Sequence, residues 1–426
     1  MLRTSLVSIV ALASALAACG PSAPQSPPPS GSTGAFGIVT VNGTQKLYLP
    51  LEEPNAAGHA VLAVIDVGVK GNGVAGAPAL LKEIDLGGLD FATTTSGDAS
   101  LVIAASTHNG RVYFIDPATD TLKQSITLDP AWGESSFSGG GGHVTGIAMD
   151  PEHHRAILSI YKGFAIIDTS TLSVQRVIEA PPSENFGFDA SKQRIIAPFY
   201  DCSSSRDAMG MSLPFCDQYK NTTGDVISDG LNVIDLADDT VYTFQNPAAK
   251  DPRRTLGDEP DSAAADPSSG LAVVPSEGDD WQNVLDMNKA TFDKASRSVT
   301  APVLQIPKIG YEGVAIEPAT HLAFLEHESS SSVAVFDLSG AAAGSTDVAK
   351  GSMPSRPDGK SWSNMGDPHG IAVTTGLADG HAVGFVVSSD RKWVARVDLP
   401  AFWAMRKDLL PDLKPAVTML DARTPK

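Results

Sequence analysis

The stretch Asn109-Gly110-Arg111-Val112-Tyr113-Phe114-Ile115-Asp116-Pro117-Ala118-Thr119 decides the fold. A short apolar run, typical of a strand, ends in an apolar-apolar-Asp step, and the turn that follows has the pattern Asp-x-x-Thr. The same strand ending returns along the chain. It is found at Val64-Ile65-Asp66, Ile166-Ile167-Asp168, Val233-Ile234-Asp235, Val335-Phe336-Asp337 and, as a variant, Ala395-Arg396-Val397-Asp398.

A second recurring segment lies ahead of these strands. It reads as a weakly patterned first strand that closes, in most copies, with an acidic residue and proline, a turn signal. A strand rich in Val, Ile, Leu and Ala follows, then the Asp-ended strand and an edge strand. Such a unit of about four strands, repeated every ~40–55 residues, is the signature of a β-propeller. The clearest first strands cover residues 146–151, 263–267, 313–318 and 370–373.

The repeats predict an all-β chain, a seven-bladed β-propeller of four-stranded antiparallel blades that forms one domain over residues 35–426. A β-sandwich or two separate β domains are the alternatives, but a sandwich gives no reason for the same turn chemistry to return so often. A short helix is expected near the C-terminus, at 401–410, before Pro411. The predicted blades lie near 35–88, 89–130, 143–180, 184–246, 258–307, 310–350 and 366–422.

On two segments the chain resembles the YVTN-type propellers, relatives of the lactonase and quinoprotein-like propellers. The segments are residues 109–119 and Pro368-His369-Gly370-Ile371-Ala372-Val373. The resemblance covers nearly all of residues 35–422. It implies the architecture and leaves the activity open, because this superfamily holds enzymes, cofactor carriers and pure binding modules.

The N-terminus predicts export. Arg3 and an apolar run over 6–18, too short to span a bilayer, have the layout of a signal peptide at 1–18. The run ends Leu16-Ala17-Ala18-Cys19-Gly20, which resembles the lipobox of bacterial lipoproteins and implies that Cys19 is lipidated; an ordinary signal peptide is the alternative. Residues 19–34, rich in Pro, Ser and Gly, predict an extended tether. Gly20 after the cysteine favours, by that resemblance, the outer membrane, with the propeller on its periplasmic or cell-surface side.

The formal net charge of −18 limits the partners. A strongly acidic surface argues against nucleic acid and against anionic lipid as ligands. An acidic surface fits an exported protein, and it also fits a protein that binds cations. We expect a monomer that reaches the membrane through its N-terminal lipid alone.

Cys202 and Cys216 are the only cysteines after Cys19. In an exported chain a disulfide between them is the default expectation, and zinc is disfavoured because no histidine or second cysteine pair lies nearby at ligand spacing. Both fall in an insertion over 201–229, between the second and third strands of the fourth blade. A loop of this length is commonly functional or disordered, and the disulfide argues for order.

Blade topology places the candidate site. Loops that lead into first strands and loops that join second to third strands lie on one face, around the central channel. This face collects carboxylates and imidazoles. Aligned repeats put Asp90, Thr145, Asp261, Glu312 and His369 at like positions, with His143 and Glu259 one layer above. The second-to-third turns add Glu52, Glu53, His108, Glu277, Asp279, Asp280, Glu326, His327, Glu328 and Asp390.

Two interpretations of this mouth stay open. Propeller channels are wet, so the polar side chains can be merely solvated. Alternatively they form a site, in which carboxylates supply hard oxygen ligands for calcium and histidine suits zinc or iron. No cofactor is required by any motif: the chain lacks the Cys-x-x-Cys-His of covalent haem.

The leading functional hypothesis is a non-catalytic binding propeller, anchored by lipid, with a protein or small-molecule ligand at the acidic mouth. The alternative is a lactonase-like hydrolase. In that enzyme a divalent metal held by Asp261 and Glu312 polarises an ester carbonyl, and His143 or His369 moves the proton. If the polar side chains at the mouth are only solvated and bind no ligand, the insertion over 201–229 is the next candidate site.

Lipidation of Cys19 is the first testable prediction. Mass spectrometry of the mature N-terminus should find Cys19 as the first residue, carrying acyl mass, because each buried methylene adds about 0.8 kcal/mol of membrane affinity and several chains anchor firmly. Cys19→Ala should release the protein from the membrane fraction. An unacylated N-terminus, or a variant that stays membrane-bound, contradicts the prediction.

Overall fold

A computed structural model describes residues 36–421 of the chain, with gaps at 52–53, 71–78, 89–93, 107–109, 133–143, 201–218, 222, 280, 308–312, 319, 328–331, 343–348, 354–367, 375–382, 389–392 and 399–416. The chain divides into two units, Met1–Gly31 and Ser32–Lys426, and all described residues belong to the second. Cys19, Cys202, Cys216 and the helix expected at 401–410 lie outside the described residues.

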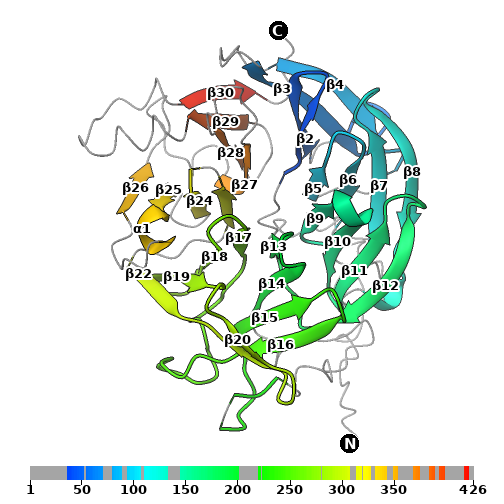
Figure 1. Ribbon diagram of the computed structural model, residues 1–426. Coiled ribbons are helices and arrows are strands. Elements are labelled where there is room, and N and C mark those ends of the chain that lie inside the picture. Colours follow the sequence, from blue (N-terminus) through cyan, green and yellow to red (C-terminus); the bar gives the residue numbers. More distant parts are fainter. Residues whose placement is uncertain are drawn as a thin grey trace, which may run out of the picture. The chain divides into compact units, whose positions relative to one another are not determined.

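The second unit is an all-β propeller, with its sheets following one another in chain order (Figure 1). The strands of the first three sheets are β1 (Ile38–Val41), β2 (Thr44–Leu51), β3 (Val61–Lys70), β4 (Ala79–Asp85), β5 (Thr94–Gly97), β6 (Val102–Ala105), β7 (Arg111–Asp116), β8 (Thr121–Thr127), β9 (Ile147–Asp150), β10 (Arg155–Ile160), β11 (Gly163–Asp168) and β12 (Ser173–Glu179). The fourth and fifth begin with β13 (Gly187–Asp189), β14 (Arg194–Phe199), β15 (Gly230–Asp235), β16 (Thr240–Phe244), β17 (Ala264–Asp266), β18 (Leu271–Val274) and β19 (Trp281–Asp286).

The remaining strands are β20 (Thr291–Asp293), β21 (Ser298–Thr300), β22 (Val303–Pro307), β23 (Gly313–Glu317), β24 (Leu322–His327), β25 (Ser332–Asp337), β26 (Ala349–Met353), β27 (Pro368–Thr374), β28 (Val383–Ser388), β29 (Trp393–Asp398) and β30 (Val417–Asp421). Helix among the described residues is limited to η1 (Pro130–Trp132), η2 (Pro151–His153) and α1 (Ser339–Ala342). None of it is long and apolar enough to cross a bilayer.

Four-stranded antiparallel blades are confirmed, but the prediction that every blade has four strands is wrong for one. Among the described residues six sheets have four strands and the fourth sheet has six, because β21 and β20 join it. β21 pairs in parallel with β16, matching Thr243 with Ser298. The β20–β21 hairpin leaves its own blade because its side chains pack on the neighbour: the Phe292 ring meets Tyr242 edge-on at 5.0 Å, and the Arg194 guanidinium lies 4.1 Å above the same ring.

Each sheet buries both of its faces. Along β3, Val61, Ala63, Ile65 and Val67 pack with the last sheet, while the alternate residues Leu62 and Val64 pack with the second sheet. Successive strand residues point to opposite faces, so a strand covered on both sides must be apolar throughout. This explains the continuous apolar runs of the second and third strands, and it places the cores between the blades.

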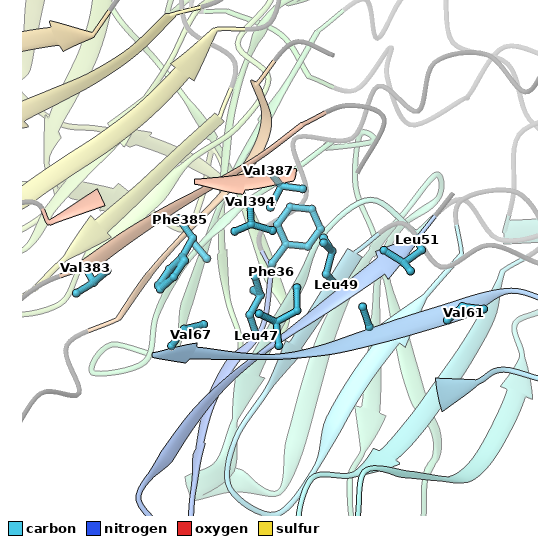
Figure 2. Packing of buried hydrophobic residues seen from close by; sticks show 13 residues of the cluster. Phe36, Leu47, Leu49, Leu51, Val61, Val67, Val383, Phe385, Val387 and Val394 are labelled. Carbon is cyan, nitrogen blue, oxygen red and sulfur yellow. The ribbon is translucent and has the colours of Figure 1, made fainter. Parts of the chain in front are cut away.

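The ring closes without an exchanged strand, since the first sheet draws on β1 to β4 and the last on β27 to β30. Apolar contact joins them instead: Phe36 and Leu49 from the first sheet lie in one cluster with Phe385, Val387 and Val394 from the last (Figure 2). The Arg396 guanidinium adds a hydrogen bond of 2.8 Å to the Val67 carbonyl. Closure therefore depends on side-chain packing.

The repeated aspartates that end third strands form the turn hydrogen bond expected from their recurrence. Oδ1 of Asp116 accepts the Ala118 backbone N–H at 2.9 Å, and Oδ1 of Asp337 accepts that of Ser339 at the same distance. Asp168, Asp235 and Asp286 make equivalent bonds at 2.8, 3.1 and 3.1 Å. The side chain imitates a backbone turn, which explains why aspartate recurs.

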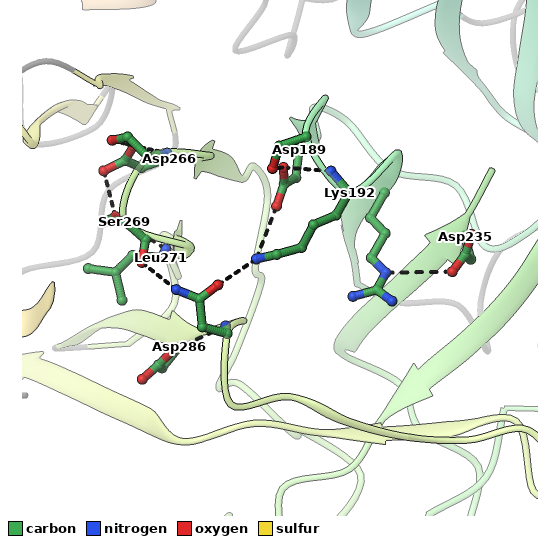
Figure 3. A network of polar contacts seen from close by, with 11 residues as sticks. Asp189, Lys192, Asp235, Asp266, Ser269, Leu271 and Asp286 are labelled. Atoms are coloured by element: carbon green, nitrogen blue, oxygen red, sulfur yellow. Dashed lines mark hydrogen bonds and ion pairs between the residues drawn. The ribbon is translucent and has the colours of Figure 1, made fainter. Parts of the chain in front are cut away.

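Polar contacts link neighbouring sheets where first strands end (Figure 3). Lys192 Nζ donates to Asn288 Oδ1 at 2.7 Å and pairs with Asp189 at 3.5 Å, which connects the fourth and fifth sheets. Asp266, buried, accepts Ser269 Oγ at 2.5 Å and lies 2.7 Å from His321 Nδ1 of the sixth sheet. At these first-strand ends the acidic side chains Asp189 and Asp266 are therefore held by polar contacts with nearby residues.

Truncation of Phe385 tests how the ring closes. Phe385→Ala should lower the free energy of unfolding by about 3–5 kcal/mol, because it removes a fully buried ring and leaves a cavity between the first and last sheets. Denaturant unfolding measures the change. Leu81→Ala, at a position 48% exposed on β4, is the control and should stay within about 0.5 kcal/mol. Equal effects of the two substitutions would show that the closure does not depend on this packing.

Candidate functional site

Asp261 is the described residue on which the candidate site centres. It lies in the loop that leads into β17 and is 4% exposed. Its Oδ2 is buried and has no hydrogen-bond partner among the described residues. The backbone carbonyl of the same residue accepts the Asn185 N–H at 3.3 Å, so the loops that lead into β13 and β17 are held together. A buried carboxylate oxygen without a partner is costly and calls for an explanation.

Four other carboxylates surround Asp261 closely enough to affect its ionisation. Burial raises the pKa of the Asp261 carboxyl well above its ordinary value, and Glu184, Glu277, Glu259 and Glu326 raise that pKa further by charge repulsion. Their loops belong to three successive sheets, the fourth to the sixth. Glu184 precedes β13, Glu259 precedes β17, Glu277 follows β18, and Glu326 lies near the end of β24. Glu184, Glu259 and Glu277 thus lie in the two kinds of loop that the sequence analysis expects on the channel face, whereas Glu326 lies on a strand.

Tyr200, directly after β14, is part of the same cluster. Its hydroxyl donates to Glu184 Oε1. Burial, and then the charges of Glu184, Asp261 and Glu259, raise the pKa of the Tyr200 phenol far above its ordinary value. The phenol is therefore a protonated donor throughout the physiological range, and it holds the Glu184 carboxylate in place.

The five acidic side chains differ in exposure. Glu259 is exposed, Glu184 and Glu277 are partly buried, and Asp261 and Glu326 are buried. Glu326 is placed by its register partner Gly313: a Cβ at Gly313 would lie 2.5 Å from Glu326 Oε1. Only glycine leaves room for the carboxylate there.

The outer part of the cluster is held by the loop over 257–259. The Glu277 N–H donates to the Glu259 carbonyl at 2.9 Å, and the Asp258 N–H donates to Asp279 Oδ2 at 2.6 Å. Glu259 has a φ of 50°, in the left-handed region that a non-glycine residue adopts at a cost. The loop therefore fixes Glu259 at the edge of the cluster.

Thr145, aligned with Asp261 in the sequence, has a different role. It is buried, and its Oγ1 lies 2.7 Å from Ser159 Oγ and donates to the Ser183 carbonyl at 2.9 Å. These contacts connect the third sheet to the loop that leads into the fourth. Thr145 is a structural residue of the channel wall.

The structure describes only some of the other residues that the sequence analysis predicted for the site. His369 falls on β27 and His327 ends β24. Asp90, His143, Glu312, Glu52, Glu53, His108, Asp280, Glu328 and Asp390 lie outside the described residues, as does most of the insertion over 201–229. Among the residues that are described, no three Asp, Glu, His or Cys side chains come together at the spacing of a metal site.

The sequence analysis missed Glu184 and Tyr200. A pattern in the chain marks Glu184: the acidic residues that end first strands, Asp189, Asp266 and Glu317, are each preceded five positions earlier by another acidic residue, which is Glu184, Asp261 and Glu312 respectively. Tyr200 carries no comparable pattern. Its contact with Glu184 depends on how the loops after β14 and before β13 approach each other.

A separate cleft of ≈ 740 Å³ lies at the outer edge of the third and fourth sheets, away from Asp261. Its carboxylates are already paired: Asp239 with Arg176 at 2.7 Å, Asp238 with Lys294 at 2.9 Å, and Glu179 with Lys162 at 3.0 Å. Asp261, by contrast, has a buried Oδ2 for which the described part of the chain supplies no hydrogen-bond partner. The cluster around Asp261 is therefore the stronger candidate for binding.

Comparisons with known proteins identify the fold alone. No protein-family model matches the chain, and no curated protein matches its sequence. Hydrazine synthase of Kuenenia stuttgartiensis is similar in structure, with a TM-score of 0.51 and 11% identity over 94% of this chain and 98% of that one. The WD40 domain of Toxoplasma gondii coronin has a TM-score of 0.52 and 10% identity over 87% and 81%.

Replacing Asp261 should stabilise the protein. The folded-state pKa of this carboxyl is raised, so the native state holds the proton more tightly than the unfolded state, and stability is lost as pH rises above the ordinary aspartate pKa of about 3.9. Asp261→Asn removes this loss. Its Tm should exceed that of the wild type by about 2 °C or more at pH 7.5, and the difference should vanish toward pH 4.

Thermal unfolding across this pH range measures the effect, and Asp116→Ala is the control. Loss of the Asp116 turn hydrogen bond should cost about 1 kcal/mol at pH 7.5. If Asp261→Asn lowers Tm at pH 7.5, the side chain holds the fold together and the site is misplaced.

Proposed function

We propose that this chain is an exported binding module, anchored through lipidated Cys19 and the tether over 19–34, whose propeller binds a positively charged ligand at the channel mouth around Asp261. The six-stranded sheet counts as a seventh blade in this proposal, and a Cys202–Cys216 disulfide closes the insertion beside the mouth. The observation that carries the proposal is the buried, unpartnered Oδ2 of Asp261 among four further carboxylates.

Charge complementarity supports a cationic ligand. Removing a carboxylate from water costs several kcal/mol unless an opposite charge and hydrogen bonds compensate. In the free protein, other carboxylates increase that cost at Asp261. A ligand that brings positive charge relieves the repulsion and binds the folded state alone, so it stabilises the protein in proportion to its affinity and concentration.

A binding role also fits the architecture. The loops around Asp261 come from three sheets whose packing fixes them, and a rigid scaffold that presents loops is a common design of recognition surfaces. The similarity to the coronin WD40 domain supports the fold of such a module, and the ligand must be argued from the site itself.

The lactonase-like hydrolase remains the second candidate, on the same buried carboxylate. There Asp261 and Glu312 would hold a divalent metal such as calcium that polarises an ester carbonyl, and His143 or His369 would move a proton. Two observations separate the candidates: stoichiometric calcium retained by the purified protein, lost in Asp261→Asn, and hydrolysis of a lactone. Both favour the enzyme.

Thermal shifts at low salt test the proposed function. Cadaverine and a pentalysine peptide are the cationic probes, calcium is the probe for the hydrolase, and glutarate and glucose are the controls. At least one cationic probe should raise the Tm of the wild type, by about 2 °C or more at saturation, and leave Asp261→Asn unchanged. Asp238→Asn, at the outer edge of the fourth sheet, should respond like the wild type. If no cationic probe distinguishes the wild type from Asp261→Asn, the proposed function is wrong.

A further inference from the structure

The acidic side chains around Asp261 are graded in depth. Glu259 is exposed at the rim, Glu277 is partly buried, and Asp261 and Glu326 are buried. Glu259 and Asp261 lie in the loop before β17, Glu277 follows β18, and Glu326 lies on β24. The Glu277 N–H donates to the Glu259 carbonyl at 2.9 Å, and Glu259, Glu277 and Glu326 each raise the pKa of Asp261. We call this series of carboxylates, from the exposed Glu259 to the buried Asp261, the acidic path.

We infer that this path binds an extended chain carrying two or more primary ammonium groups; the inference rests on the proposed function and names its ligand class. One small ion contacts only those oxygens that reach it at about 2.3–2.6 Å. An extended polycation can instead place successive charges beside Glu259, Glu277 and Asp261. Asp261 is more than nine-tenths buried, and its Oδ2 has no hydrogen-bond partner among the described residues, so a donor from a ligand would satisfy it.

The donor chemistry of an ammonium group fits these acceptors. An ionised carboxylate accepts hydrogen bonds and donates none, whereas an ammonium donates three and accepts none. The innermost ammonium would donate to Asp261 Oδ2, and the pKa of Asp261 would fall toward its ordinary value as the charge arrives.

Tyr200 suits the methylene segments of such a chain. Its hydroxyl donates to Glu184 and its side chain is only partly buried, so an aromatic ring lies beside the acidic groups. Alkyl stems of amines pack on apolar and aromatic surface while their charged ends remain among polar groups. The ligand would therefore be a free polyamine or a lysine-bearing peptide, which share this chemistry.

Calorimetric titration of the full-length protein at low salt tests the inference. The probes are butylamine with one ammonium group, cadaverine with two, spermidine with three, pentalysine, and calcium. Affinity should rise roughly tenfold with each added ammonium, since each contributes a charge-assisted hydrogen bond of about 1.5 kcal/mol. Asp261→Asn and Glu277→Gln should each weaken spermidine binding by roughly tenfold or more, and added salt should weaken it further. Asp238→Asn is the matched control and should bind as the wild type does.

Each outcome is decisive. Spermidine binding tighter than pentalysine identifies a free polyamine, and the reverse identifies a lysine-bearing protein segment. Equal affinity for one, two and three ammonium groups, or Asp261-dependent binding of calcium alone, overturns the inference and leaves the proposed cationic site standing. If no probe binds in an Asp261-dependent way, both fail. The melting temperature of each variant, measured alongside, shows that lost binding does not reflect unfolding.

Discussion

The structure depends on one constraint: every described sheet has neighbours on both faces, so the apolar cores lie between sheets. Alternate residues of β7 illustrate it, since Tyr113 and Ile115 pack toward the first sheet while Val112 and Phe114 pack toward the third. Because each core is shared between two sheets, no sheet is expected to be stable alone, and the ring of sheets must close. Phe36, Leu49 and Phe385 close the ring without a shared strand. The cooperativity of folding therefore depends in large part on side-chain packing between the first and last sheets.

The acidic groups at the two ends of the first strands have different surroundings. Where first strands end, acidic groups form hydrogen bonds within the fold: Asp266 accepts one from Ser269 of its own sheet and lies 2.7 Å from His321 Nδ1 of the next sheet. Around Asp261 the described acidic groups repel one another instead. The same residue type thus stabilises one face and destabilises the other. A scaffold whose stability comes from apolar seams can tolerate that cost at the mouth, which is a common compromise between stability and binding.

Much of the fold follows from the sequence because it is repeated local chemistry. The Asp-ended third strands were predictable, since the Asp116 and Asp337 side chains bond to backbone two residues on. The β20–β21 hairpin was not, because its parallel pairing with β16 depends on Phe292 meeting Tyr242 and Arg194, residues distant in sequence. Loop parity predicted Asp261 and Glu277 as candidate site residues, which they remain, whereas Tyr200 required knowledge of which segments touch.

The five-residue spacing between paired acidic residues connects the two faces. A first strand that begins near Glu184 or Asp261 ends at Asp189 or Asp266, so one short strand carries a carboxylate at each end. The lower carboxylate is fixed by turn hydrogen bonds in every such repeat, as Ser268 and Ser269 show for Asp266. The upper carboxylates are held differently: Glu184 accepts a hydrogen bond from the Tyr200 hydroxyl, whereas Asp261 Oδ2 has no hydrogen-bond partner among the described residues. Strand geometry does not explain the buried oxygen of Asp261, and a donor brought by a ligand is the explanation that the proposed function offers.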